Sequence, residues 1–139
     1  MKILFMCVAN SARSQIAEGV AKSLFGSKAE IESAGSQPKY VNPFAIEVMK
    51  EIGVDLSKNQ SKTVDQLSQD FVKGLDYVIT LCAEEVCPVL ISRAKKLHWP
   101  LTDPAGHNEL SEDEQLNLFR DTREAIKEKL LAFKKELKI

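Results

Sequence analysis

The first 25 residues of the chain predict a buried strand followed directly by an amphipathic helix. Residues 2–8 form a nearly continuous apolar run, which is typical of a parallel strand covered on both faces. In residues 14–25, apolar side chains recur every three to four positions and form one face of a helix, which Gly26 is placed to end. The short connection between the two therefore lies at the end of a strand and at the start of a helix.

The rest of the chain continues this alternation. Further strands are predicted at residues 29–33, 76–81 and 96–101, and further helices at residues 43–52, 64–71, 88–96 and from 111 onward. Asn42 before Pro43 is typical of a helix start, and Ser111 with Glu114 forms a capping box. The pattern predicts an α/β fold, a four-stranded parallel sheet flanked by helices in three layers. We expect residues 1–139 to form a single domain, because the chain has no repeat, linker or low-complexity tract.

The turn between the first strand and the first helix has the composition of an oxyanion-binding loop. Its residues are Cys7, Val8, Ala9, Asn10, Ser11, Ala12 and Arg13, and Ser14 follows them. Backbone N–H groups at such a turn, with the positive end of the helix dipole, bind phosphate-shaped anions without a metal. Arg13 can hold two oxygens with its planar guanidinium group, and the same surroundings stabilise the thiolate form of Cys7. We interpret Cys7 as a nucleophile; the alternative, a small core residue, is disfavoured because strand, spacing and helix all agree with the loop.

The other two cysteines, Cys82 and Cys87, follow the third predicted strand. They can be zinc ligands together with His98 and His107, two buried structural residues, or a redox pair. Zinc would leave Cys7 unconnected, and the two histidines lie in a separate region of the chain. A disulfide needs Cα atoms about 4.4–6.8 Å apart, whereas five residues of α-helix rise about 7.5 Å. A redox pair therefore requires a segment that is looped, or that unwinds when the bond forms.

Three candidate residues follow predicted strands. Cys7, Cys82 and Asp103 come after the first, third and last strands, and ligands of parallel sheets bind where the carboxyl ends of the strands meet. If the first and third strands are neighbours, Cys7 and Cys82 approach each other there. Asp103 is the candidate general acid, because an oxygen displaced by a thiolate leaves faster when it is protonated. The alternative is an ordinary turn aspartate before Pro104.

Charge and cysteine usage exclude several classes of function. The formal net charge is −1 with both signs interspersed, so neither nucleic acid nor an anionic membrane is an expected partner. No apolar stretch approaches the length of a membrane-spanning helix, and the N-terminus leads into a strand without the apolar region of a signal peptide. Three cysteines do not pair into a disulfide framework. We expect a cytoplasmic protein without a metal or other cofactor.

Six short segments resemble the thioredoxin-coupled arsenate reductases, a family that shares the fold of the low-molecular-weight protein tyrosine phosphatases. They are residues 10–19, 33–35, 80–82, 87–88, 98–99 and 103–105. The resemblance runs through nearly the whole chain, and the set of three cysteines is its most specific part. The small phosphatases have the loop and the acid but lack the pair Cys82 and Cys87.

The resemblance implies a role for each candidate residue. The implied roles are Cys7 as nucleophile, Arg13 as oxyanion clamp, Ser14 as hydrogen-bond donor to the thiolate, Asp103 as acid, and Cys82 and Cys87 as the disulfide relay. It implies reduction of arsenate to arsenite by a monomer, with thioredoxin or a similar dithiol protein as reductant. A phosphotyrosine-type phosphatase remains the alternative, because it needs only the loop and the acid.

A cation site of the family is altered in this chain. Asn10, Glu18 and Ser33 match positions that bind potassium in some members, and Lys62 stands where a further acidic ligand is expected. An ammonium group near Glu18 can replace the ion electrostatically. We therefore expect no potassium requirement.

Overall fold

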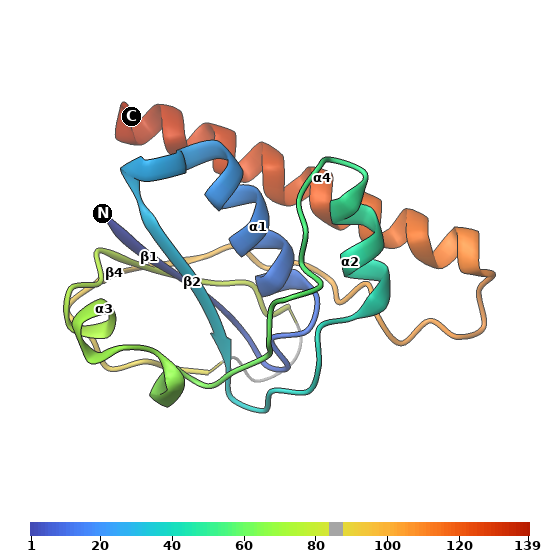
Figure 1. The fold of residues 1–139 in the computed structure, drawn as a ribbon, viewed down its shortest axis with the longest axis horizontal. Coiled ribbons are helices and arrows are strands. Elements are labelled where there is room, and N and C mark those ends of the chain that lie inside the picture. Colours follow the sequence, from blue (N-terminus) through green and yellow to red (C-terminus); the bar gives the residue numbers. More distant parts are fainter. Residues whose placement is uncertain (84–87) are drawn as a thin grey trace.

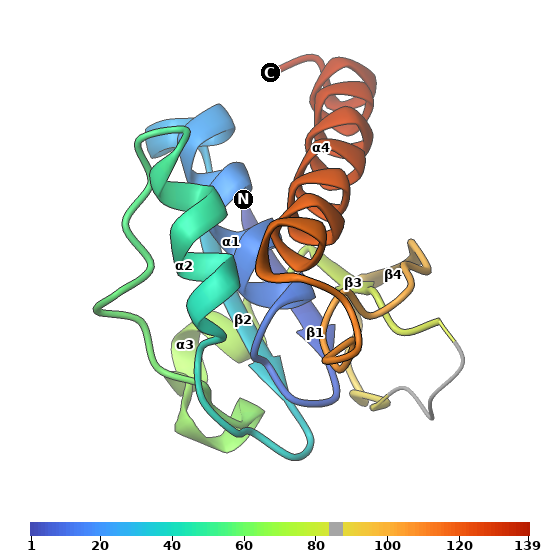
Figure 2. The ribbon, with the colours of Figure 1, turned by 90° about the vertical axis from the view of Figure 1, so that its right-hand side faces the viewer.

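The computed structural model describes residues 1–83 and 88–139, which form a parallel sheet with helices on both faces. The strands are β1 (Lys2–Cys7), β2 (Glu30–Gly35), β3 (Tyr77–Thr80) and β4 (Lys95–His98), and their order in the sheet is β2-β1-β3-β4. All three strand pairs are parallel. The helices α1 (Arg13–Phe25), α2 (Pro43–Lys50) and α4 (Glu112–Leu137) lie on one face, and α3 (Gln69–Lys73) lies on the other (Figures 1 and 2). The predicted four-stranded, three-layer α/β fold is confirmed.

β1 is the centre of both cores, which explains its continuous apolar run. Ile3 and Phe5 point toward α1 and α4, whereas Leu4 and Met6 point toward α3. These four side chains are at most 3% exposed. Because successive side chains of a strand point to opposite faces, a strand covered on both sides needs apolar residues at every position.

The predicted helix starts are confirmed for α2 and α4. The Asn42 side chain accepts a hydrogen bond from the Phe44 backbone N–H at 2.8 Å, and Ser111 and Glu114 form the predicted capping box. The spacing of apolar residues after position 111 predicts a buried stripe of Leu116, Phe119, Ile126, Leu130, Phe133 and Leu137. In the structure the buried residues of α4 are Phe119, Thr122, Ile126, Leu130 and Phe133, whereas Leu116 and Leu137 are partly buried. α4 therefore covers α1 and α2 with the face that its periodicity predicts.

An ion-pair cluster fastens α2 to α4. Arg120 Nη2 lies 2.7 Å from Glu51 Oε2, and Arg123 Nη1 lies 2.8 Å from Glu51 Oε1. Arg123 also donates a hydrogen bond to the Val48 carbonyl at 2.7 Å. The hydrogen bonds from Arg120 and then Arg123 lower the pKa of Glu51 from 4.5 to about 2.

Two predicted helices are wrong. Residues 64–71 divide into a 3₁₀ turn (Val64–Gln66) and α3, because Ser68 lies between them in extended conformation and caps α3 through the Phe71 N–H at 3.1 Å. No helix forms in the described residues 88–94, and the last strand begins at Lys95, where its N–H binds the Asp76 carbonyl at 3.0 Å. A further 3₁₀ turn, Gly26–Lys28, follows α1. Pairing with β3 thus accounts for Lys95 and Lys96, the last two residues of the segment for which a helix was predicted.

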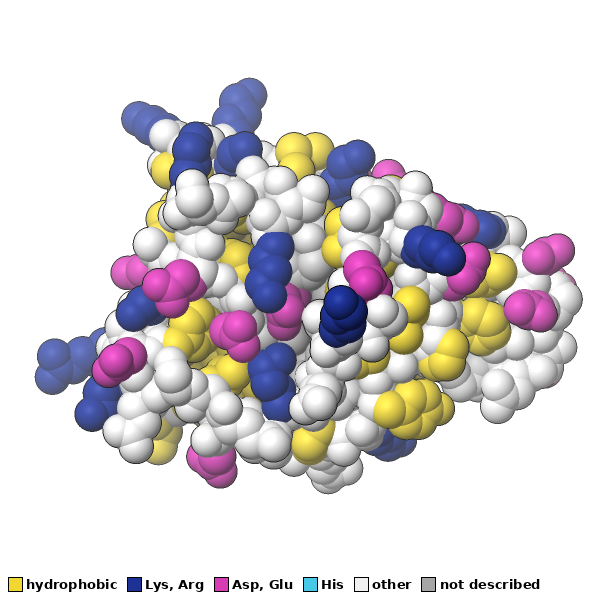
Figure 3. Space-filling model, viewed as in Figure 1, with side chains coloured by type: hydrophobic (Ala, Val, Ile, Leu, Met, Phe, Trp, Pro, Cys, Tyr) yellow, Lys and Arg dark blue, Asp and Glu magenta, His cyan; other side chains and the backbone are white. Residues whose placement is uncertain are grey.

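Charged side chains of both signs are interspersed over the face seen in Figure 3, which agrees with the near-zero net charge. Among the described residues, no helix has the length and apolar character needed to cross a bilayer.

Candidate active site

The oxyanion loop, residues 7–13, connects β1 to α1 at the carboxyl edge of the sheet. Asn10 adopts a positive φ of 48°, which turns the chain back toward the helix. The segment after β2 holds the loop from outside: the N–H groups of Gln37, Lys39 and Asn42 donate to the carbonyls of residues 8, 9 and 11 at 2.9, 3.1 and 3.0 Å. The loop is therefore fixed by β1, α1 and the segment that follows β2.

Cys7 carries a free thiol at the base of this loop and is only 2% exposed. Its Sγ lies 2.9 Å from Ser14 Oγ, and Ser14 Oγ accepts a hydrogen bond from Asn10 Nδ2 at 2.7 Å. The Asn10 amide is oriented by its own acceptor, because Oδ1 receives hydrogen bonds from the Lys62 N–H and from Gln15 Nε2, both at 3.0 Å. Since Asn10 donates to Ser14, the hydroxyl proton of Ser14 is left to point at the sulfur.

A second row of polar groups lies behind Asn10. Asn10 Nδ2 also donates to Ser33 Oγ at 3.0 Å, and Ser33 donates to Glu18 Oε1 at 2.6 Å. The Glu18 carboxylate is buried and contacts two ammonium groups, Lys22 Nζ at 2.9 Å and Lys62 Nζ at 3.8 Å. A continuous path of hydrogen bonds and ion pairs thus leads from surface lysines to the sulfur.

Arg13 and Asp103 meet on the other side of the loop. The Arg13 side chain is 5% exposed; its Nη1 donates to the Leu101 carbonyl at 3.0 Å, and its Nη2 lies 3.7 Å from Asp103 Oδ2. Asp103 is half exposed, and its other oxygen accepts the Ala105 N–H at 3.0 Å. The acid candidate is therefore held by its own turn and faces the clamp candidate.

A pocket of about 140 Å³ opens between these groups. Cys7, Arg13 and Asp103 all line it, together with Ala9, Ser11 and Ala12 of the loop, so the structure brings six of the predicted site residues together. Its other lining residues are Lys39, Tyr40, Asn42 and Ala105, of which the first three have no predicted place in the site. They follow β2, the other neighbour of β1, so the rule that places ligands at strand carboxyl ends could have found them.

Cys82 reaches the same edge of the sheet from β3. Met6 pairs with Thr80, and the Leu81 N–H donates to the Met6 carbonyl at 3.0 Å, so Cys7 and Cys82 follow adjacent strands. The expectation that the first and third strands are neighbours is confirmed. Cys82 is 1% exposed and disulfide-bonded, and residues 81–83 form no helix. Cys87 lies outside the described residues.

The residues considered for zinc have other partners. His98 Nδ1 lies 2.7 Å from Thr80 Oγ1, whereas His107 Nε2 lies 3.3 Å from the Asp103 carbonyl. In residues 1–83 and 88–139, no group of three or more His, Cys, Asp or Glu side chains is arranged to hold a metal ion.

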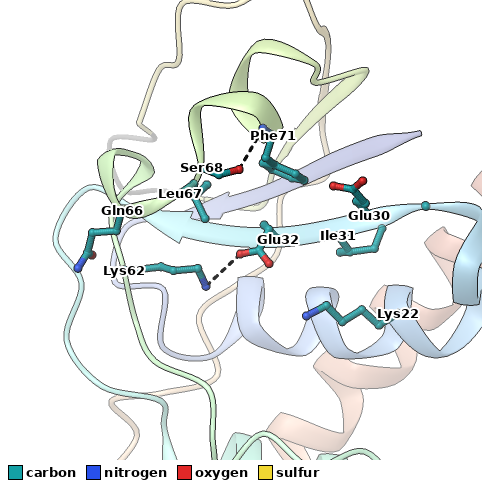
Figure 4. A pocket seen from close by; sticks show the side chains of 10 residues that line it. Lys22, Glu30, Ile31, Glu32, Lys62, Gln66, Leu67, Ser68 and Phe71 are labelled. Atoms are coloured by element: carbon teal, nitrogen blue, oxygen red, sulfur yellow. Dashed lines mark hydrogen bonds and ion pairs between the residues drawn. The ribbon is translucent and has the colours of Figure 1, made fainter.

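A larger pocket of about 460 Å³ lies at the free edge of β2, away from the cysteines (Figure 4). It contains Lys22, Glu30, Glu32 and Lys62 over an apolar floor that includes Phe71. Lys62 Nζ lies 3.9 Å from Glu32 Oε2, as drawn in Figure 4, besides its contact with Glu18. Its lysines are engaged by glutamates, its Ser68 hydroxyl caps α3, and none of its described lining residues is a cysteine. We therefore do not place the chemistry there.

The sequence matches the family model described as low molecular weight phosphotyrosine protein phosphatase over residues 2–139. It is 40% identical over 133 residues to an arsenate reductase of Halalkalibacterium halodurans, which covers 94% of this chain and 93% of that protein. The chain belongs to this phosphatase family and, within it, to the arsenate reductases.

Solved structures agree with this assignment. An arsenate reductase in the reduced state superposes with a TM-score of 0.76 at 33% identity and covers 99% of both chains. A thioredoxin-dependent arsenate reductase of Corynebacterium glutamicum gives a TM-score of 0.68 at 31% identity, over 97% of this chain and 62% of that longer one. The resemblance inferred from the short sequence segments is confirmed.

Proposed function

We propose that this protein reduces arsenate to arsenite with a three-cysteine relay that thioredoxin, or a similar dithiol protein, restores. The observation that carries the proposal is the free Cys7 thiol inside a loop closed by Arg13, with Cys82 at the end of the adjacent strand. The arsenate reductases among its relatives support the substrate. A phosphatase needs the first of these features but has no use for a second cysteine at the strand end.

The first step is attack by the Cys7 thiolate on arsenic. The loop N–H groups and Arg13 hold the arsenate oxygens, and the Ser14 hydroxyl, 2.9 Å from the sulfur, stabilises the thiolate. Asp103 protonates the departing oxygen, which leaves as water, and a sulfur–arsenic bond takes its place. Arsenic remains pentavalent in this adduct.

Electron transfer occurs in the second step. Cys82 is disulfide-bonded in the structure, so the external dithiol must reduce this bond before the step can occur. The Cys82 thiolate then attacks Cys7 Sγ, the sulfur–arsenic bond breaks, and its electron pair stays on arsenic, which leaves as trivalent arsenite. A disulfide between Cys7 and Cys82 remains. Cys87 then attacks Cys82, which frees Cys7 and moves the disulfide to a position that an external dithiol reduces.

The test supplies arsenate, thioredoxin, thioredoxin reductase and NADPH to the purified protein and follows NADPH loss. We expect one arsenite for each NADPH consumed. Cys87→Ser should release a single equivalent of arsenite and then stop, because Cys7 stays in the disulfide. Steady turnover by Cys87→Ser contradicts the relay, and absence of arsenate-dependent NADPH loss in the unaltered protein overturns the function.

The second candidate function is hydrolysis of aryl phosphomonoesters. The observation that favours it is that Cys7, Arg13 and Asp103 share one pocket without the help of Cys82. Turnover of an aryl phosphate that Cys82→Ser leaves unchanged, together with no arsenate reduction, would favour this candidate.

The proposal includes a setting for the enzyme. A thiol relay that must be reduced in every cycle suits the cytoplasm, where disulfides are rare. We propose that residues 1–139 act there as a single domain and as a monomer, which light scattering coupled to gel filtration checks directly.

A further inference from the structure

The rim of the active-site pocket carries a cation that has no part in the steps above. Lys39 lines the pocket together with Cys7, Arg13 and Asp103. Within residues 1–83 and 88–139, its side chain forms no ion pair and no hydrogen bond. The other cation that lines this pocket, Arg13, has the Leu101 carbonyl and the Asp103 carboxylate as partners.

The backbone holds Lys39 in register with the oxyanion loop. The Lys39 N–H donates to the Ala9 carbonyl at 3.1 Å, and the flanking bonds from Gln37 to Val8 and from Asn42 to Ser11 measure 2.9 and 3.0 Å. The side chain is exposed, but its starting point is fixed beside the anion site. Lys39 therefore differs from lysines on segments that make no hydrogen bond to the loop.

A further cation changes the net charge of the groups that line the pocket. Arg13 contributes one positive charge, and the reactive thiolate form of Cys7 contributes one negative charge. Asp103 lies 3.7 Å from Arg13 Nη2 and is neutral when it carries the proton that it donates in the first step. These three groups together are then uncharged, and Lys39 gives the pocket the net positive charge that attracts a phosphate-like dianion.

We propose that Lys39 is a specificity-determining residue that selects dianionic tetrahedral oxyanions at the mouth of the pocket. The inference rests on the proposed function, because it concerns the same pocket. The neutral product, arsenious acid, gains nothing from a nearby ammonium group. Lys39 thus favours binding of the charged substrate over the uncharged product.

The test measures binding of inorganic phosphate by calorimetry to the full chain, to Lys39→Ala and to Lys39→Arg. The attraction between one cation and a dianion about 8 Å apart in a water-like medium corresponds to about a sixfold change in Kd. We therefore expect Lys39→Ala to weaken phosphate binding about sixfold at low ionic strength and less than about twofold in 1 M salt, where the Debye length is about 3 Å. Lys39→Arg keeps the charge and should bind as the unaltered protein does.

Lys28→Ala is the matched control, because it removes the same charge at the amino end of β2, the opposite edge of the sheet. Equal effects of Lys28→Ala and Lys39→Ala, or unchanged phosphate binding by Lys39→Ala at low salt, overturn the inference. With arsenate, Lys39→Ala should raise KM and leave kcat within about twofold. If no variant reduces arsenate, the proposed function fails while phosphate binding still decides the role of Lys39.

Discussion

Replacing Gly35 by alanine tests how closely β2 supports the oxyanion loop. A methyl group at this position would lie 2.4 Å from the Val8 carbonyl oxygen, 2.8 Å from the Cys7 oxygen and 2.9 Å from the Asn10 nitrogen. All three are backbone atoms of the loop, so no side-chain rotation relieves the contact. Restoring an ordinary distance of about 3.5 Å requires the loop to move by about 1 Å.

A shift of this size acts directly on the nucleophile. Because a misplacement of about 1 Å can reduce a rate about 100-fold, kcat/KM for arsenate should fall by about that factor in Gly35→Ala. The NADPH-coupled assay measures this loss, and calorimetry with inorganic phosphate measures the accompanying loss of anion affinity.

Gly53→Ala separates loop distortion from general destabilisation. Gly53 has a φ of +79°, so alanine is strained there by about 1 kcal/mol, but its methyl group would meet nothing within 4 Å. Urea unfolding should show a loss of stability in both variants, whereas only Gly35→Ala should lose activity. A Gly35→Ala protein with kcat/KM within threefold of the unaltered enzyme refutes the steric argument.

Ser14, Lys62 and Glu51 make contacts whose loss has a measurable result. Ser14→Ala removes the hydroxyl that lies 2.9 Å from the nucleophilic sulfur. Because a hydrogen bond to a charged group contributes about 1.5–3 kcal/mol, the rate of the first turnover should fall roughly 10- to 100-fold in rapid-quench measurements. An unchanged rate contradicts this role of the hydroxyl. Because Lys62 Nζ lies 3.8 Å from Glu18, its ammonium group takes the place of a potassium ion, and potassium should not raise turnover above sodium at equal ionic strength. A potassium-specific increase in turnover counts against this role of Lys62. Hydrogen bonds from Arg120 and Arg123 lower the pKa of Glu51 from 4.5 to about 2. These ion pairs therefore stabilise the fold above pH 4.5, and the stabilisation is lost as the pH falls toward 2. Glu51→Gln should therefore lower the free energy of unfolding by about 1–2 kcal/mol at pH 7, a range that allows for a side chain that is one-third exposed. Near pH 2 the same substitution should change it by almost nothing. An equal change at both pH values would exclude a contribution of the ion pairs to stability.

The parts of the fold that local sequence determines could be predicted well. β1 is apolar from Ile3 to Cys7 because it is covered there on both faces, and the caps at Asn42 and Ser111 depend only on neighbouring residues. The meeting of Cys7 and Cys82 at one edge follows from strand order in a parallel sheet. These inferences need no knowledge of distant contacts.

The wrong predictions concern segments whose conformation depends on distant partners. Residues 88–96 have helical periodicity, yet Lys95 joins a strand because β3 offers it a backbone partner. The hydrogen bond that the Lys62 N–H donates to Asn10 could not be predicted, since it joins segments far apart in the chain. Lys39 was missed, although it follows β2 and lies where ligands of parallel sheets bind. The sequence predicts Cys7 as the nucleophile, and the resemblance names Ser14 as its hydrogen-bond donor, but neither gives the contacts of Asn10 that orient Ser14.

The burial of α4 has a consequence for biosynthesis. This helix supplies Phe119, Ile126, Leu130 and Phe133 to the core over α1, and the ribosome adds all four after every strand of the sheet. A nascent chain therefore exposes the apolar face of α1 until translation has passed residue 133.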